Sequence, residues 1–203
     1  HRASHRETLR TDGVDAEVFL AALESLARGG RVQGWIAAGG FEAQPELLEQ
    51  GAARLPLIGT APADARRVRD PQDFFAMLRD LRLAHPPVRF DPPADAQGWL
   101  VKNPRSSGGW GVQRAGSAAP ECAYWQRERS GRPMSATFVA NGQDAVLLGI
   151  NEQNTVALRE HPFVFAGVVG PLPVGDALQR EVVSAVRAIT REYKLRGLAS
   201  LDF

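Results

Sequence analysis

The chain has 203 residues, of which 44% are hydrophobic and 23% charged, which is the composition of a globular protein with one large or two small domains. The formal net charge of +1 gives no electrostatic reason to expect a nucleic acid or an anionic membrane as partner. Cys122 is the only cysteine; it excludes an intrachain disulfide and a cysteine-cluster metal site, and it fits a reducing cytoplasm.

The first third of the sequence predicts helices that alternate with short strands, after an irregular end over residues 1–13. The expected elements are helices over 15–28 and 46–53 and strands over 32–38 and 55–58. Gly29-Gly30 ends the first helix, and Pro45 suits the first turn of the second. This alternation is typical of the end of an α/β unit with a parallel sheet. The turn Gly39-Gly40-Phe41-Glu42 fits a plain strand-to-helix connection better than a ligand contact.

A further helix is expected to begin at Asp70, a good N-cap, with Pro71 in its first turn. Pro86-Pro87 prevents its continuation, and a turn-rich connector follows over 91–98. The arginines just before this helix, at 66, 67 and 69, fit a solvated face, or alternatively a patch that attracts a polyanionic ligand.

A strand over 99–103 then runs into a glycine-rich loop. Pro104 ends the strand because it has no amide proton to donate, and Lys102 is one of only two lysines among 24 basic residues. The loop residues expected to approach an anion through their backbone amides are Ser106, Ser107, Gly108, Gly109 and Gly111. Lys102 adds a compact positive charge beside them, which suits a phosphate group. The alternative is a hairpin turn with an incidental lysine, because one glycine-rich loop is a weak signal.

The rest of the chain predicts an antiparallel block and a long helix. The expected strands are 124–129, 136–140, 145–151, 163–169 and 198–203. Asn141-Gly142 predicts a tight hairpin turn. Apolar residues at helical spacing predict a helix from Gly175-Asp176 to about Lys194, with Gly197 as its C-cap.

Two further features gain meaning beside Lys102. The polar strand from Tyr124, with Gln126, Arg127 and Arg129, offers a backbone edge that a purine ring requires. Asp202 lies on a strand directly after a helix, where a carboxylate can hold Mg²⁺ beside a triphosphate. Taken alone, Asp202 fits an ordinary aspartate at the end of a strand better than a metal ligand.

Together these segments resemble the ATP-grasp superfamily from about residue 31 onward. The most specific matches are Leu100-Val-Lys-Asn-Pro-Arg-Ser-Ser-Gly-Gly-Trp-Gly-Val112, Gln126-Arg-Glu-Arg-Ser-Gly-Arg-Pro-Met-Ser-Ala136 and Gly197-Leu-Ala-Ser-Leu-Asp-Phe203. These segments are most similar in sequence to a carboxylate–amine ligase-like branch of the superfamily. That branch is found in methylotrophic bacteria, near tetrahydromethanopterin pathways.

The resemblance implies a mixed α/β and α+β fold, in which a parallel α/β pre-ATP-grasp domain is followed by an ATP-grasp domain of two antiparallel α+β lobes. The implied boundaries are 1–62 for a partial pre-ATP-grasp domain, 63–98 for a linker helix and connector, and 99–203 for an ATP-grasp domain that continues beyond the chain.

The resemblance also implies the ligands. Lys102 and the loop 106–111 would contact the phosphates of ATP, the backbone around Gln126, Arg127 and Arg129 would face adenine, and Asp202 would be the first ligand of Mg²⁺. The implied reaction joins a small-molecule carboxylate to an amine through an acyl phosphate, in the cytoplasm, without nucleic acid or membrane, and with a homodimer as the expected assembly. The alternative is a module of this fold that binds nucleotide without catalysis.

The sequence departs from the family pattern at three places. Pro133 and Ser135 stand where an acidic ribose contact is expected. Pro71 stands near the place of a second phosphate-binding lysine, for which Arg69 or Arg66 is a substitute. The Glu-x-Asn pair that completes the metal site would lie beyond Phe203, so we expect this chain alone to bind metal weakly.

Overall fold

The computed structural model describes residues 15–30, 32–41, 44–116 and 119–203. The expected irregular end over 1–13, and Glu42 of the expected turn, lie outside the described residues. Four helices precede the first sheet: α1 (Ala16–Arg28), α2 (Pro45–Arg54), α3 (Pro62–Arg69) and α4 (Pro71–Asp80). The predicted helices at α1, α2 and α4 are confirmed. Among these described helices none is both long and apolar enough to cross a membrane.

Local sequence signals explain where these helices begin. The Asp15 carboxylate accepts a hydrogen bond from the Val18 amide at 3.1 Å, and so caps α1. Asp70 caps α4 in the same way. The sequence pattern misses α3, because this helix contains no buried residue and therefore no apolar stripe.

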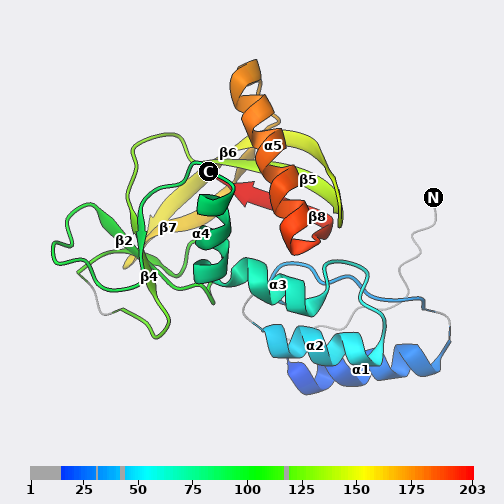
Figure 1. Ribbon diagram of the computed structural model, residues 1–203. Coiled ribbons are helices and arrows are strands. Elements are labelled where there is room, and N and C mark those ends of the chain that lie inside the picture. Colours follow the sequence, from blue (N-terminus) through cyan, green and yellow to red (C-terminus); the bar gives the residue numbers. More distant parts are fainter. Residues whose placement is uncertain (1–14, 31, 42–43, 117–118) are drawn as a thin grey trace.

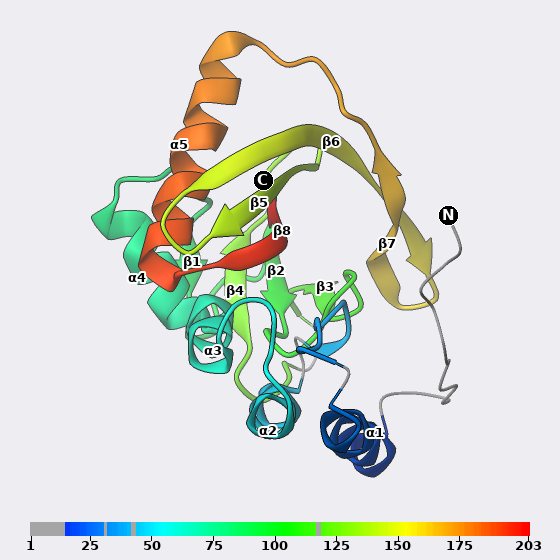
Figure 2. The same cartoon turned by 90° about the vertical axis from the view of Figure 1, so that its right-hand side faces the viewer.

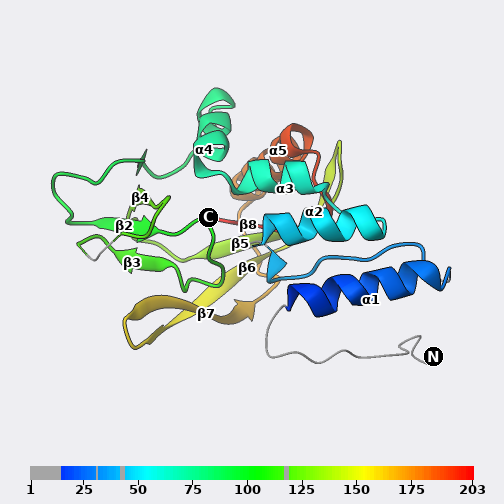
Figure 3. The same cartoon turned by 90° about the horizontal axis from the view of Figure 1, so that it is seen from below.

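The two strands predicted for a parallel sheet in the N-terminal part do not form at the expected length. Within the described residues, 32–38 and 55–58 contribute one isolated parallel bridge, between Trp35 and Leu57. The Trp35 ring packs instead against Phe19 and Phe41, with ring centroids 5.2 and 5.5 Å apart. The apolar run around Trp35 therefore serves the packing of α1 and α2, which lie side by side in Figures 2 and 3, rather than a sheet.

Two four-stranded sheets, both antiparallel throughout, form the rest of the molecule. The first has the order β1-β4-β2-β3, from Val88–Arg89, Tyr124–Arg127, Trp99–Lys102 and Val112–Arg114. The second has the order β7-β6-β5-β8, from His161–Val169, Ala145–Leu158, Met134–Asn141 and Arg196–Asp202. The predicted antiparallel block is confirmed, and the short strands β1 and β3 are additions that residue patterns do not reveal.

The helix α5 (Asp176–Tyr193) covers one face of the second sheet (Figure 1). Phe138, Val186 and Tyr193 are at most 2% exposed and form the centre of the core between them. The predicted hairpin turn is confirmed, with Gly142 at φ +92°. The C-cap is Lys194 at φ +48°, so the prediction of Gly197 as the cap is wrong; Gly197 lies within β8.

The second sheet is curved and arches over the first (Figure 2). The end of β8 points toward the strands β2 and β4, as Figures 1 and 3 both show. The other face of the second sheet, opposite α5, therefore looks toward the strand that carries Lys102.

Candidate functional site

Lys102 is the last residue of β2 and pairs with Val112 on one side and Tyr124 on the other. The Asn103 amide still donates to the Gly111 carbonyl at 2.9 Å, in the register of the β2–β3 pairing. The ladder ends at Pro104, which has no amide proton to donate. Lys102 is half-buried. Burial lowers the pKa of its ammonium group, because the charged form loses hydration, and the Asp202 carboxylate partly opposes this change.

Asp202 reaches the same place from the second sheet. It lies at the end of β8, where it pairs with the buried Ser135, and its Oδ1 accepts a hydrogen bond from Gln153 Nε2 at 2.7 Å. Its side chain stays accessible to solvent, yet the surrounding protein raises its pKa by desolvation. The Gln153 hydrogen bond and the charges of Lys102 and Arg69 oppose that rise. The fold therefore brings the predicted phosphate ligand and the predicted metal ligand together from two different sheets.

The glycine-rich loop turns immediately after Lys102. Asn103 organises it, because its Oδ1 accepts from the Arg105 amide at 2.9 Å and its carbonyl accepts from the Ser106 amide at 3.1 Å. The loop residues 108 and 109 have φ of +61° and +78°, which glycine adopts without a steric cost. Ser107 and Gly108 are exposed, whereas Ser106 and Gly111 are half-buried against each other.

The loop is closed onto the second sheet. The Phe165 amide of β7 donates to the Gly108 carbonyl at 2.9 Å, and Gly109 lies directly against the Phe163 carbonyl. The Trp110 ring meets the His161 ring edge-on, with centroids 5.2 Å apart. The loop therefore bridges the two sheets beside Lys102 and Asp202.

Gly109→Ala is expected to detach this loop from β7. A Cβ at Gly109 would lie 1.8 Å from the Phe163 carbonyl oxygen, whereas a Cβ at Gly108 would meet nothing nearer than 3.5 Å. Both changes carry the left-handed backbone cost of about 1–2 kcal/mol, so Gly108→Ala is the matched control. We expect hydrogen exchange of the Phe165 amide to accelerate by roughly tenfold or more only in Gly109→Ala. Equal protection in the two variants would contradict this description of the loop.

Arg69, one of the two arginines considered as a substitute for a phosphate-binding lysine, reaches the same place. It ends α3, and its Nη2 donates to the Pro104 carbonyl at 2.8 Å and to the Ser106 carbonyl at 3.0 Å. Its charge also acts on Asp202 and Tyr124. Arg66 points elsewhere and pairs with Glu49 at 2.8 Å. Of the two arginines considered as substitutes for a lysine, only Arg69 lies at the loop.

The three residues expected at a purine occupy different surroundings. Gln126 pairs with Leu100 within the sheet, so its side chain shares a face with that of Lys102. Arg127 points to the opposite face: its guanidinium lies 5.6 Å from the Trp99 ring centroid and donates to the Gln97 carbonyl at 2.7 Å. The Arg127 amide is bonded to the Pro87 carbonyl at 2.9 Å. Arg129 is exposed, just after β4.

At this place, Asp202 supplies a carboxylate of the kind that binds Mg²⁺. No group of three His, Cys, Asp or Glu side chains suited to a metal ion occurs in the part of the chain that the structure describes. Mg²⁺ typically takes one or two carboxylates and completes its shell with water and phosphate oxygens. The donor chemistry of Asp202 therefore fits an ion that arrives with a nucleotide.

An open groove of about 850 Å³ lies away from these residues. Arg191, Lys194 and Arg196 line one of its sides, at the end of α5 and the start of β8. Because Asp202 is six positions after Arg196 along β8, the Arg196 end of this groove is about 20 Å from the candidate site. The sequence-predicted ligand residues do not line it.

Comparison with known proteins assigns the fold. A family model described as an ATP-grasp domain matches residues 70–203, and a comparison with curated protein sequences gives no significant match. An Archaeoglobus fulgidus protein of the ATP-grasp superfamily is 23% identical, with a TM-score of 0.56, over 78% of this chain and 48% of that one.

Two enzymes named in solved structures have similar folds. The biotin carboxylase domain of Hydrogenobacter thermophilus 2-oxoglutarate carboxylase, solved with MgADP and bicarbonate, is 11% identical, with a TM-score of 0.70, over 97% of this chain and 50% of that one. An L-amino acid ligase from Bacillus licheniformis is 13% identical, with a TM-score of 0.69, over 93% of this chain and 49% of that one. At these identities the likeness establishes the fold, and this chain spans about half the length of these structures. Because the family model covers most of the sequence and the two-sheet architecture agrees with it, the chain belongs to the ATP-grasp family.

Proposed function

We propose that this chain is the nucleotide-binding part of an ATP-dependent ligase that joins a carboxylate to an amine. One observation carries the proposal: Lys102 on β2 and Asp202 on β8 come from two antiparallel sheets and lie close enough for their charges to interact, beside a glycine-rich loop that bridges those sheets. Solved structures with this fold include a biotin carboxylase, an L-amino acid ligase and a D-alanyl-alanine synthetase, which supports an ATP-dependent reaction of this class.

The proposed ligands divide by chemistry. Lys102 and Arg69 supply positive charge to the phosphates. The influence of both charges on Asp202 supports this assignment, because it indicates that both lie near the proposed metal ligand. Hydroxyl and amide groups of the loop surround the same phosphates; these are the groups of Ser106, Ser107, Gly108, Gly109 and Gly111. Adenine lies along β4 at Gln126, Arg127 and Arg129, with the segment from Arg129 onward as the freer part, since the Arg127 and Glu128 amides already donate to the Pro87 and Gly98 carbonyls.

In the proposed reaction the substrate carboxylate attacks the γ-phosphorus, the bond from that phosphorus to the ADP oxygen breaks, and an acyl phosphate forms. The amine then attacks the acyl carbon, and phosphate leaves with the electron pair of the broken bond. Lys102 and Arg69 neutralise charge that accumulates on the phosphoryl oxygens, and closure of the loop excludes water. Mg²⁺, held by Asp202 and phosphate oxygens, would add further neutralisation when bound.

The assembly and setting belong to the same proposal. The partners would be a small-molecule carboxylate and amine, without nucleic acid or membrane, and the exposed, free Cys122 supports a reducing cytoplasm. A homodimer, which light scattering would detect, and membership of the methylotroph branch are predictions from resemblance alone.

Trapping the acyl phosphate tests this function. The full-length protein would be incubated with ATP, Mg²⁺, hydroxylamine and a panel of carboxylates, and hydroxamate and ADP would be measured. A ligase is expected to form the two products in equal amounts with at least one acid. ATP binding without either product across the panel would favour the alternative, a nucleotide-binding module without catalysis.

Asp202→Asn separates stability from ligand binding. The raised pKa of Asp202 means that the folded protein binds its proton more readily than the unfolded chain, so the ionised carboxylate lowers stability above that pKa. We expect the ligand-free variant to melt at a higher temperature than wild type near neutral pH, with the difference shrinking as the pH falls through the raised pKa. We also expect the variant to lose Mg²⁺-dependent stabilisation by ATP.

Thermal melts from about pH 4 to about pH 8 measure both effects. Asp144→Asn, at an exposed carboxylate of the β5–β6 turn that pairs with Arg187, is the control and should leave the ATP response intact. An Asp202→Asn protein that keeps the full Mg²⁺-dependent response would remove Asp202 from the proposed metal site.

A further inference from the structure

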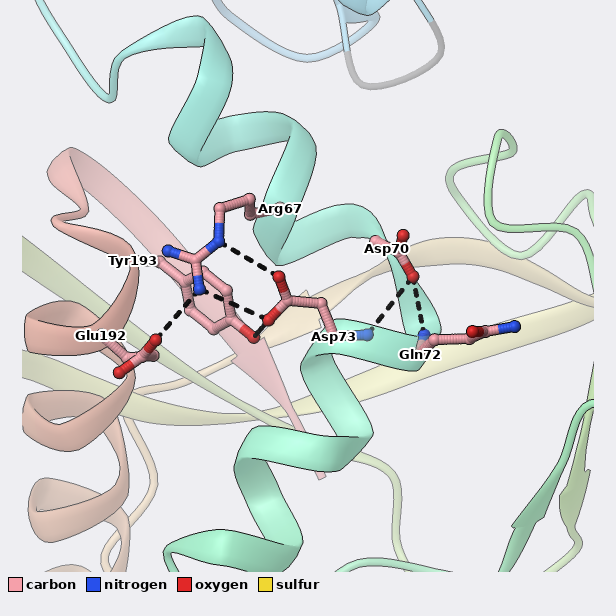
Figure 4. A network of polar contacts seen from close by, with 6 residues as sticks. All are labelled: Arg67, Asp70, Gln72, Asp73, Glu192 and Tyr193. Carbon is pink, nitrogen blue, oxygen red and sulfur yellow. Dashed lines mark hydrogen bonds and ion pairs between the residues drawn. The ribbon is translucent and has the colours of Figure 1, made fainter.

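A network of four side chains joins the junction of α3 and α4 to the last turn of α5 (Figure 4). Arg67 is its centre: Nε lies 3.1 Å from Asp73 Oδ2, and Nη2 lies 3.0 Å from Glu192 Oε1. The Tyr193 hydroxyl donates to Asp73 Oδ1 at 3.0 Å. The Arg67 guanidinium also lies over the Tyr193 ring, 5.1 Å from its centroid. These four residues are called the junction network below.

The junction network is firmly anchored on both sides. Tyr193 is fully buried, and both burial and the Asp73 carboxylate raise its pKa, so its hydroxyl remains a neutral donor. Asp73 belongs to the first turn of α4, where the Asp70 carboxylate accepts from the amides of Gln72 and Asp73 at 2.8 and 3.3 Å. The orientation of the α3–α4 junction relative to α5 is therefore set by several bonds at once.

The same junction carries Arg69, which extends in the other direction. Arg67 and Arg69 are two residues apart on α3, so their side chains leave the helix about 200° apart. Arg67 is bound to α5, while Arg69 donates to the carbonyls of Pro104 and Ser106, on either side of Arg105 in the loop. Because Arg67 and Arg69 both lie on the short helix α3, a movement of Arg67 away from α5 would also move Arg69.

We propose that the junction network is a positioning device, which holds Arg69 against the glycine-rich loop and thereby links the end of α5 to loop closure. None of its four residues contacts the candidate phosphate site; they act through Arg69. The part of this inference that concerns nucleotide affinity rests on the proposed function. The part that concerns the loop does not.

Trypsin cleavage after Arg105, mapped by mass spectrometry without nucleotide, tests the effect on the loop. Arg105 is exposed, so its cleavage rate depends on how firmly the Arg69 bonds hold the residues beside it. We expect the rate to rise about threefold to tenfold in Arg67→Met, Tyr193→Phe and Arg69→Met. Arg66→Met is the matched control: it lies on α3, like Arg67, and removes an ion pair with Glu49 of α2. Its cleavage rate should match that of wild type.

Cleavage at other arginines in the same digest corrects for global unfolding. If Arg67→Met fails to fold, Tyr193→Phe still tests the network, because it keeps the buried ring and removes only the hydroxyl. An unchanged rate at Arg105 in the folded network variants would overturn the proposal. An equal rise in Arg66→Met would do the same, because it would reduce the network to general helix packing.

A double-mutant cycle on Mg²⁺-ATP affinity provides a measurement that a merely structural role would not move. Arg67→Met is expected to weaken binding about threefold to tenfold when Arg69 is present and to have no further effect in Arg69→Met. If Arg67→Met weakens binding equally in both backgrounds while binding still depends on Lys102, the positioning role is overturned and the proposed function is not. Absence of ATP binding in wild type would instead refute the proposed function, and the trypsin result would still decide whether the network holds the loop.

Discussion

Phe138→Ala is expected to unfold the chain or bring it close to unfolding. Phe138 is 2% exposed in the middle of β5, between β6 and β8, and packs within the core under α5. Truncation of a buried phenylalanine costs about 3–5 kcal/mol, while domains of this kind are stable by only about 5–15 kcal/mol. Urea unfolding monitored by circular dichroism would measure the loss.

Val139→Ala is the matched control for this core prediction. Val139 follows Phe138 on the same strand, but its side chain is on the opposite face and is 43% exposed. We expect a cost below about 1 kcal/mol for this change. A similar loss of stability in both variants would show that the α5-covered face of the second sheet is not the principal core.

Lys102→Met is expected to abolish the response to nucleotide. If ATP binds as proposed, ligand at 100 times its dissociation constant stabilises the wild type by about 2.7 kcal/mol, which corresponds to a rise in Tm of about 5–10 °C. The variant keeps the aliphatic stem and removes a charge whose burial is unfavourable, so the ligand-free protein should remain folded. Thermal melts with and without Mg²⁺-ATP would measure the response.

The chain supplies its own control, since Lys194 is the only other lysine. Lys194 lies at the C-cap of α5, beside the open groove rather than the loop. Lys194→Met removes the same charge and should keep the full ATP response. A response lost in Lys194→Met and kept in Lys102→Met would transfer the nucleotide to the groove.

Local signals are sufficient to predict most of the architecture. Asp15 and Asp70 identify helix starts, apolar spacing identifies α5, and Asn141-Gly142 identifies the β5–β6 hairpin, because each depends on neighbours in sequence. The expected strand around Trp35 fails, because an apolar run suits a strand and a helix-packing segment equally well. Lys194 takes the cap expected of Gly197, since the chain must turn into β8 two residues later.

The candidate site, too, can be predicted from the sequence only in part. A lysine before a glycine-rich loop and an aspartate at a strand end are visible in the sequence, and the fold brings both together. Their ligands remain proposals. The junction network, and the choice of Arg69 over Arg66, are not visible, because most of the bonds that decide them join residues 35 to 125 positions apart. An arginine run before a helix gives no indication of which member points toward which partner.

The most direct test of the proposed site is a crystal structure of the protein with Mg²⁺ and a non-hydrolysable ATP analogue. We predict phosphates between β2 and β8 in contact with the Lys102 ammonium, with residues 106–111 folded over them. A nucleotide bound in the groove beside Arg196, or phosphates that do not touch Lys102, would contradict this prediction.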